Sequence, residues 1–123
     1  MAATRSGFSS LQRLHNSTDF GRVFGDSVRS ADGFFTVLGR PNARNIARLG
    51  LTISRRAAKR AVDRNKLKRL ARESFRMQRE LPTWDFVVMA KPGAAAADAR
   101  TLRQSLDQHF RRLATKASAD RNG

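Results

Sequence analysis

The segment from Trp84 to Ala90 constrains the fold of this chain more than any other. Its sequence, WDFVVMA, is a nearly continuous apolar run. A strand with one solvated face alternates apolar and polar residues, whereas a run of this kind is typical of a strand buried on both faces. We therefore predict that this segment is the central strand of a sheet.

A basic amphipathic helix is predicted just before this strand, from about Ala61 to Arg79, and Pro82 marks its end. Successive side chains of a helix lie about 100° apart, and this spacing separates two arcs. The apolar arc holds Leu67, Leu70, Ala71, Ser74, Phe75 and Met77, and the other arc holds Asn65, Lys66, Lys68, Arg69, Arg72, Arg76 and Arg79, with Arg64 at the border. We expect the apolar arc to pack on the sheet and the basic arc to face a partner.

A shorter helix is predicted near the start of the chain, where Asn16 can cap the first free N–H groups. Phe20, Val23 and Phe24 then share one face of that helix. Periodicity favours burial of these side chains in the core, and it leaves open an exposed role for the aromatic rings in stacking on bases.

Two runs of strand-forming residues, 34–38 and 48–53, are separated by turn formers at 40–45, and we predict that the two runs pair as a hairpin. Residues 28–31 are predicted to add a short strand. The order of strand 48–53, basic helix and strand 84–90 suggests a βαβ unit.

The last predicted element is an amphipathic helix marked by Leu102, Leu106, Phe110 and Leu113, and the polar tail 118–123 after it is expected to be disordered. A chain of 123 residues fits one domain, which we place over residues 1–117. The chain has no cysteine, no run of 18 apolar residues, and no apolar run of a signal peptide near its start. We expect a cytoplasmic protein outside the membrane.

Positive charge is the unusual quantity in this composition. The formal net charge is +15, and the 25 cations comprise 20 Arg and 5 Lys. Residues 55–79 alone hold eleven cations and two anions. Nearly all charges of this segment are positive, so they would repel one another on an isolated helix. Arginine side chains are suited to bidentate contacts with phosphate groups. The sequence therefore predicts a nucleic-acid partner rather than a solvated surface.

Catalysis by the protein alone is not expected from its residues. The two histidines, His15 and His109, lie in different segments with no flanking carboxylate pattern, and each is expected at the surface or in a cap. No metal-ligand spacing, glycine-rich phosphate loop or nucleophile motif is present. Asp63 and Asp85 are expected to serve helix capping or strand ends.

Residues 64–76, with the sequence RNKLKRLARESFR, resemble the signature of the bacterial ribonuclease P protein family. Flanking segments support this resemblance: 50–56 and 85–91 are similar to two strands of the family, and 13–24 is similar to its first helix. The resemblance covers about residues 11–115. It implies an α+β single domain in the order α-β-β-β-α-β-α, a sandwich with a mixed four-stranded sheet and a left-handed βαβ crossover, which is an exception to the usual hand.

The resemblance also implies a division of labour within ribonuclease P. The RNA subunit is expected to hold Mg²⁺ and to cleave precursor tRNA, while the protein binds the 5′ leader and stabilises the folded RNA. The protein is expected to bind no cofactor of its own and to need no obligate protein partner.

Carried over residue by residue, the resemblance assigns two groups of side chains. It places Arg13, Phe20, Phe24, Arg55, Arg56, Arg64 and Asn65 in or beside the cleft that binds the leader, and Lys66, Lys68, Arg69, Arg72 and Arg76 on the surface that binds the catalytic RNA. Lys66 stands where the family commonly has Arg, which keeps the charge but loses the planar guanidinium.

The main alternative is a basic ribosomal or ribosome-associated protein that binds rRNA without a role in cleavage. A DNA-binding module is less favoured, because the basic helix offers no evident set of base-reading side chains. A protein nuclease would need paired carboxylates or histidines around metal ions, and the sequence does not supply them.

Overall fold

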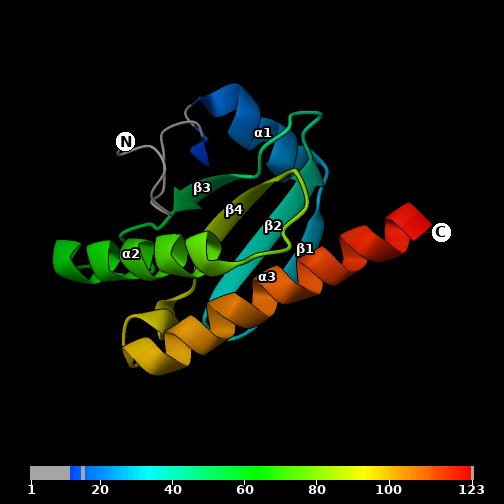
Figure 1. Ribbon diagram of the computed structural model, residues 1–123. Coiled ribbons are helices and arrows are strands. Elements are labelled where there is room, and N and C mark those ends of the chain that lie inside the picture. Colours follow the sequence, from blue (N-terminus) through cyan, green and yellow to red (C-terminus); the bar gives the residue numbers. More distant parts are fainter. Residues whose placement is uncertain (1–11, 15, 123) are drawn as a thin grey trace, which may run out of the picture.

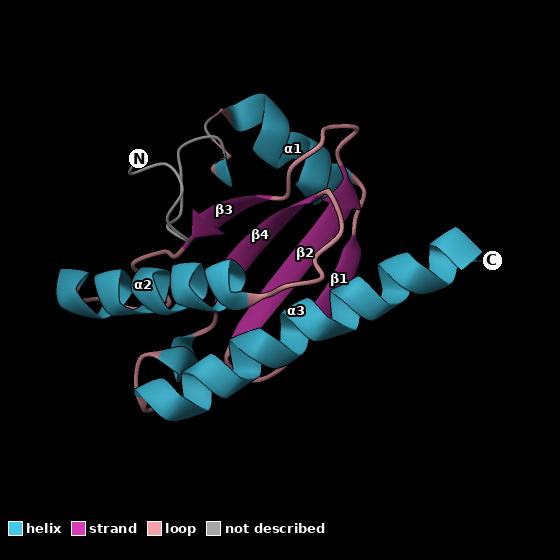
Figure 2. Ribbon diagram, viewed as in Figure 1, coloured by secondary structure: helices cyan, strands magenta, loops and turns pink. Residues whose placement is uncertain are grey.

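The structure, a computed structural model, describes residues 12–14 and 16–122. Its elements, drawn in Figures 1 and 2, are α1 (Ser17–Gly25), β1 (Val28–Ala31), β2 (Phe35–Pro41), β3 (Arg48–Thr52), α2 (Ala61–Met77), β4 (Trp84–Ala90), the short 3₁₀ helix η3 (Pro92–Ala94) and α3 (Ala99–Asn122). The predicted order α-β-β-β-α-β-α is confirmed. Residues 1–11, His15 and Gly123, which belong to the predicted domain and tail, lie outside the described residues.

The four strands form one mixed sheet in the order β1-β2-β4-β3. β4 pairs antiparallel with β2 and parallel with β3, and its residues 84–88 are all buried. The prediction that the run from Trp84 to Ala90 is a central strand is confirmed. An apolar strand is most stable at this position, because its neighbours cover both of its edges and both of its faces.

The predicted hairpin between runs 34–38 and 48–53 is wrong. β2 forms its hairpin with β1 instead, and β4 lies between β2 and β3. Because the apolar β4 lies between β2 and β3, the connection from β2 to β3 has to pass the end of β4. The turn formers after β2 form this longer connection. Asn42 holds this connection, since its Nδ2 donates to the carbonyl oxygen of Ile46 (3.0 Å) and its Oδ1 accepts from the N–H of Arg44 (2.9 Å).

The parallel strands β3 and β4 are joined by α2 in a βαβ unit, as predicted. In Figure 1, α2 lies in front of the sheet, and β4 lies to the left of β3 when the two strands are turned to point upward. This crossover is left-handed, as the family resemblance implies, and it is against the usual hand.

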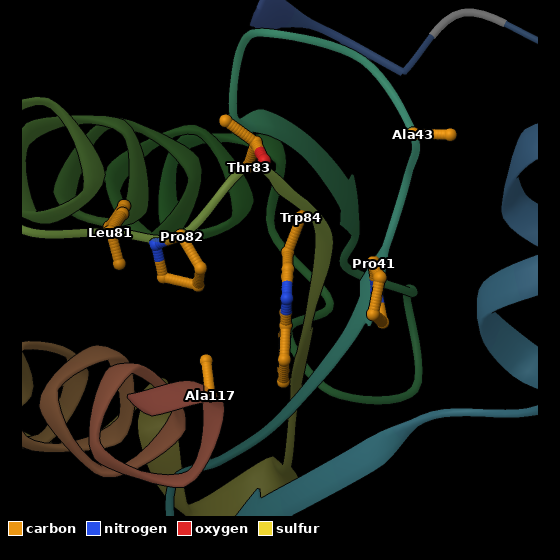
Figure 3. Close-up of a pocket in the computed structure, with 7 residues that line it drawn as sticks. All are labelled: Pro41, Ala43, Leu81, Pro82, Thr83, Trp84 and Ala117. Atoms are coloured by element: carbon orange, nitrogen blue, oxygen red, sulfur yellow. The ribbon is translucent and has the colours of Figure 1, made fainter. Parts of the chain in front are cut away.

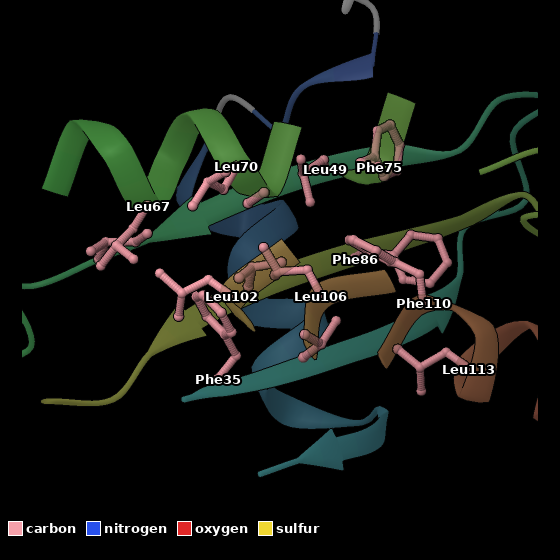
Figure 4. Packing of buried hydrophobic residues seen from close by; sticks show 14 of the residues in the cluster. Phe35, Leu49, Leu67, Leu70, Phe75, Phe86, Leu102, Leu106, Phe110 and Leu113 are labelled. Carbon is pink, nitrogen blue, oxygen red and sulfur yellow. The ribbon is translucent and has the colours of Figure 1, made fainter. Parts of the chain in front are cut away.

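The main core lies between the sheet and the two long helices, α2 and α3 (Figure 4). At its centre, the ring of Phe86 meets Phe75 and Phe110 edge to face, with ring centroids 6.2 and 5.7 Å apart. A smaller cluster on the opposite face packs α1 on the sheet through Val23, Leu14, Leu38 and Val87. All described helices thus pack on one sheet, which makes a single α+β domain.

Two boundaries differ from the sequence prediction. α2 ends at Met77 rather than Arg79, and the Met77 side chain is 59% exposed, although its place on the helical arc predicted burial. α3 continues to Asn122, so residues 118–122, expected to be a disordered tail, are helical. Within the described residues, no helix has the length and apolar character needed to cross a membrane.

Candidate RNA-binding surface

Helix α1 presents two stacked phenylalanine rings at the surface. The Oδ1 atom of Asn16 accepts a hydrogen bond from the N–H of Asp19 (2.9 Å), so the predicted cap is confirmed. Val23 is fully buried, whereas Phe24 is 50% exposed and Phe20 is half-buried. The rings of Phe20 and Phe24 stack with centroids 6.4 Å apart and an interplanar angle of 24°. One face of α1 therefore contributes Val23 to the core and the ring of Phe24 to the surface.

Phe20 lies directly on β3 because residue 50 has no side chain. A Cβ atom added to Gly50 would stand 2.6 Å from Cε1 and Cζ of Phe20, and 3.0 Å from Cδ1 of Leu14. Real Cβ atoms do not approach other atoms so closely, so Gly50 allows the ring to rest on the sheet backbone.

The strand register extends this surface beyond α1. Leu38, Val87 and Gly50 stand in one row across β2, β4 and β3, and the next row on the same face is Thr36, Met89 and Thr52. Met89 packs against the α1 cluster and remains half-buried, while Thr52 is exposed. Met89 and Thr52 were not predicted as site residues from the sequence. Each lies two residues after Val87 or Gly50 in its strand, and this spacing could have placed them on the same face.

A buried ionic cluster fixes α1 relative to the sheet. Arg48 is only 7% exposed, and it donates to both carboxylate oxygens of Asp85, from Nε (2.8 Å) and from Nη2 (2.7 Å). Its Nη1 donates to Oδ2 of Asp19 in α1 (3.3 Å), and Nδ2 of Asn42 donates to Oδ1 of Asp85 (2.9 Å). The two carboxylates raise the pKa of Arg48 against the opposing effect of burial. No sequence pattern indicated this cluster beyond the charge of Asp85 near the start of an apolar strand.

The residues of α2 that were predicted to bind RNA fall into three groups. Asn65, Arg69 and Arg76 are exposed and form what we call the outer ridge, on the side of α2 opposite the core. Arg64, Lys68 and Arg72 are half-buried, follow one another at intervals of four residues, and form what we call the β3 flank. Lys66 lies toward α3.

Hydrogen bonds to backbone carbonyl groups occupy two of these cations. Nη1 of Arg64 donates to the carbonyl oxygens of Ala58 (3.0 Å) and Lys59 (2.8 Å), which holds the loop between β3 and α2. Nζ of Lys66 donates to the carbonyl oxygen of Ala97 (3.3 Å), just before α3. Both side chains therefore have a structural role beside the RNA-binding roles assigned to them from the sequence.

The remaining predicted cations gather at the two ends of β3. Arg13 is exposed and lies beside β3, where the N–H of Leu14 donates to the carbonyl oxygen of Leu49 (3.0 Å). Arg55 and Arg56 are exposed in the turn that follows β3. A hollow of about 120 Å³ is lined by Arg13, Leu14, Leu49, Gly50, Leu51 and Arg72. The structure thus brings together Arg13 and Arg72, which the sequence reasoning gave to different RNA partners.

Another hollow lies between the end of α3 and the start of β4 (Figure 3). Its volume is about 600 Å³, and its lining consists of Pro41, Ala43, Leu81, Pro82, Thr83, Trp84 and Ala117. Among the described residues that line this hollow, none carries a charge, in contrast to the cations on the surface of α2.

His109 corrects one prediction: it is fully buried rather than at the surface or in a cap. Its position on α3, next to Phe110 and three residues after Leu106, places it on the apolar face. Nδ1 of His109 lies 2.7 Å from the Ser30 hydroxyl, and Nε2 lies 3.2 Å from Oδ2 of Asp32. Burial lowers the pKa of His109, with the Asp32 contact opposing the shift. Within residues 12–14 and 16–122, no three His, Cys, Asp or Glu side chains gather to hold a metal ion.

A small α+β domain with a stacked aromatic pair at the surface of one helix and exposed arginines on another has the features of an RNA-binding protein. Residues 8–114 match the sequence model of the family described as Ribonuclease P. The chain belongs to the ribonuclease P protein family.

The curated relatives agree with this assignment over nearly their whole length. The ribonuclease P protein component of Methylococcus capsulatus is 44% identical over 113 residues, which is 91% of this chain and 88% of that protein. That of Thioalkalivibrio sulfidiphilus is 43% identical over 92% of this chain and 95% of its own length.

Solved structures of two bacterial proteins share the fold. The RNase P protein of Staphylococcus aureus has a TM-score of 0.76 at 27% identity, covering 81% of this chain and 93% of its own. The RNase P protein of Thermotoga maritima has a TM-score of 0.72 at 32% identity, covering 82% and 96%. The chain thus has the role of the protein subunit of ribonuclease P, an endoribonuclease, and its partner is the RNA subunit. These matches favour this role over the ribosomal alternative.

Proposed function

We propose that this protein assists the RNA subunit by binding the single-stranded 5′ leader of precursor tRNA on the face of the sheet that carries α1. The observation that supports this proposal most is the exposure of Phe24, which stacks on Phe20 and is still 50% exposed. Unpaired bases stack on exposed aromatic rings, and such stacking tolerates many sequences. A leader of variable sequence suits this mode of binding.

The cations around this face supply the second part of leader binding. Arg13, Arg55 and Arg56 are exposed near β3, and Asn65 is exposed at the start of α2. Guanidinium groups bind phosphate through paired N–H donors, so they can follow the leader backbone while its bases lie on the rings. Arg64 contributes through the loop that it holds beside them.

The arginines of the outer ridge of α2 are the proposed contact with the catalytic RNA. Arg69 and Arg76 are exposed on it, and Lys66, Lys68 and Arg72 lie on its two sides. A rigid helix that presents cations at fixed intervals can bind the phosphates of a folded RNA and reduce their mutual repulsion. The leader and the catalytic RNA would then meet at the edge of β3.

We further propose that the RNA subunit cleaves the phosphodiester and holds the Mg²⁺ ions that the reaction needs. The protein acts in the cytoplasm, where precursor tRNA is made. It requires no other protein partner for this role.

The experiment that tests the leader proposal compares holoenzymes assembled with wild-type protein and with Phe24→Ala. Removing one stack should weaken binding of leader-bearing precursor tRNA by about 1–3 kcal/mol and leave binding of mature tRNA unchanged. Met77→Ala is the matched control, because Met77 is also an exposed apolar residue (59%) but lies at the end of α2. Equal losses for precursor and mature tRNA would contradict a leader role for Phe24.

A further inference from the structure

The hollow beside Trp84 leaves apolar side chains in contact with solvent. Its volume of about 600 Å³ falls within the range of about 300–1,000 Å³ that is usual for ligand sites. In its lining, Pro41 and Ala43 are exposed, and Leu81 and Pro82 are half-buried. Apolar surface that stays open in a hollow of this size is typical of a binding site.

Trp84 is the aromatic residue of this hollow. It belongs to the main core, on the face of the sheet that packs against α2 and α3, and its ring stacks on Phe86 with centroids 6.1 Å apart. Core packing leaves 7% of Trp84 exposed, and this part lines the hollow. Figure 3 shows the indole ring edge-on, with Leu81, Pro82 and Ala117 on one side of it. The hollow can therefore hold a flat, uncharged ring against the open part of the indole.

A second hollow, of about 410 Å³, adjoins the first one, because Leu81 lines both. Two exposed arginines line it, Arg79 just after α2 and Arg111 in α3. Among the described residues, neither of these guanidinium groups pairs with a carboxylate, whereas Arg103 of α3 pairs with Asp107 (3.1 Å). Guanidinium groups bind phosphate through paired N–H donors, so the second hollow offers two cations to an anion.

Glu80 is the one acid in the described lining of the two hollows. A carboxylate repels phosphate, but it accepts hydrogen bonds from hydroxyl groups, and the two arginines outnumber it. An apolar hollow beside an indole, an acceptor for a hydroxyl group and two donors for phosphate match the base, the ribose and the phosphate of a ribonucleotide. The two hollows together thus have the composition of a nucleotide site.

We propose that the two hollows form one site for an unpaired nucleotide of the RNA subunit. The base lies in the apolar hollow against Trp84, and the phosphate accepts hydrogen bonds from Arg79 and Arg111. The RNA subunit is the occupant because it is the partner of this protein family, and because a net charge of +15 favours a polyanion over a neutral ligand. The site does not rest on the proposed binding of the leader, since α1 packs on the opposite face of the sheet.

Trp84 is the only tryptophan of the chain, so its fluorescence reports on this site directly. We expect adenosine 5′-monophosphate, added to the full chain free in solution, to quench this fluorescence along a saturable curve. Adenosine, which has no phosphate, should quench it with about tenfold weaker affinity, which is the size of one charge-assisted hydrogen bond. Fluorescence that stays unchanged up to high concentrations of the nucleotide would overturn the site, and this readout needs no variant that could fail to fold.

Arg111→Ala tests the phosphate part of the site. It should weaken binding of adenosine 5′-monophosphate about tenfold and leave the affinity for adenosine unchanged. Arg112→Ala is the matched control, because Arg112 is the next residue of α3 and is also exposed, but it lines neither hollow. Equal affinities in the two variants would overturn the assignment of the phosphate to Arg111.

Assembly of the holoenzyme tests the occupant. The fluorescence of Trp84 should be quenched when the RNA subunit binds, and Arg111→Ala should weaken this assembly by up to about tenfold while Arg112→Ala leaves it unchanged. A loss confined to binding of precursor tRNA, or no loss at all, would overturn the RNA subunit as the occupant. Failure of the proposed function would appear elsewhere, as absent leader selectivity in Phe24→Ala.

Discussion

Phe20 in α1 rests on Gly50 in β3 so closely that a Cβ at position 50 would stand 2.6 Å from two atoms of the ring. This contact sets how near α1 approaches the sheet, and it orients the ring on which Phe24 stacks. A glycine in a strand and an aromatic residue in a helix thus form one feature of the proposed leader surface, although 29 positions of the sequence lie between them.

Gly50→Ala should therefore force the ring of Phe20 away from β3. Overpacking of this kind costs about 1–3 kcal/mol, and we expect that loss in the free energy of unfolding measured with urea. Gly33→Ala is the control, because nothing lies within 4 Å of a Cβ there. Equal stability of the two variants would show that the contact does not hold α1 in place.

Arg48→Met should destabilise the protein strongly. Methionine fills much of the same volume, but it leaves the buried carboxylates of Asp19 and Asp85 without their partner. Breaking a buried ion pair by removing one member costs about 3–5 kcal/mol. Arg44→Met, at an exposed cation of the preceding loop, should change the free energy of unfolding by less than about 0.5 kcal/mol. A similarly small change in Arg48→Met would contradict the role of the cluster as a clamp on α1.

His109 should make stability decrease as the pH falls below about 7. Burial lowers its pKa below the ordinary value of 6.5, so the unfolded chain binds more protons than the folded protein in this range. The contribution is complete above the unfolded pKa and is lost as the pH falls toward the folded pKa. Hydrogen bonds from Ser105, Phe35 and Phe34 outweigh burial and hold the pKa of Asp32 at about 2, outside this window.

His109→Gln is the variant that isolates this effect, because glutamine does not titrate. Urea unfolding at pH 7 and at pH 5 should show a smaller difference for the variant than for the wild-type protein. The same difference in both proteins would mean that other groups cause the pH dependence.

The outer ridge of α2 should control the salt dependence of assembly with the RNA subunit. Neutralising Arg69 and Arg76 together should weaken assembly and reduce the slope of log K against log salt concentration by about one unit per lost phosphate contact. Arg100→Ala, at an exposed cation of α3, is the control. An unreduced slope in the ridge variant would exclude phosphate contacts at these two positions.

Helices and strands could be predicted from the sequence wherever the spacing of apolar residues and the capping residues determine them. β1 and β4 have the predicted bounds, and Asn16 caps α1 as expected. The pairing of β2 with β3 was predicted wrongly, because sequence proximity favours a hairpin whereas the apolar β4 needs a neighbour on each side. The local sequence pattern does not show which strands take the places beside β4.

The candidate site was predictable by residue type and less so by arrangement. Charge and periodicity identified the cations of α2, but they could not separate Arg64, which holds a loop, from exposed Arg69. They also could not place Arg13 beside Arg72, because the contact depends on the segment before α1 running along the edge of β3. Buried polar partners such as Arg48 with Asp85 become visible only once the strands are paired.

The most direct test of the central claim is cleavage of a 5′-extended precursor tRNA at low Mg²⁺ by a bacterial ribonuclease P RNA, with and without this protein. We predict that the protein restores cleavage at the mature 5′ end and that the protein alone cleaves nothing. Failure to stimulate several such RNAs, or cleavage by the protein without RNA, would contradict the account.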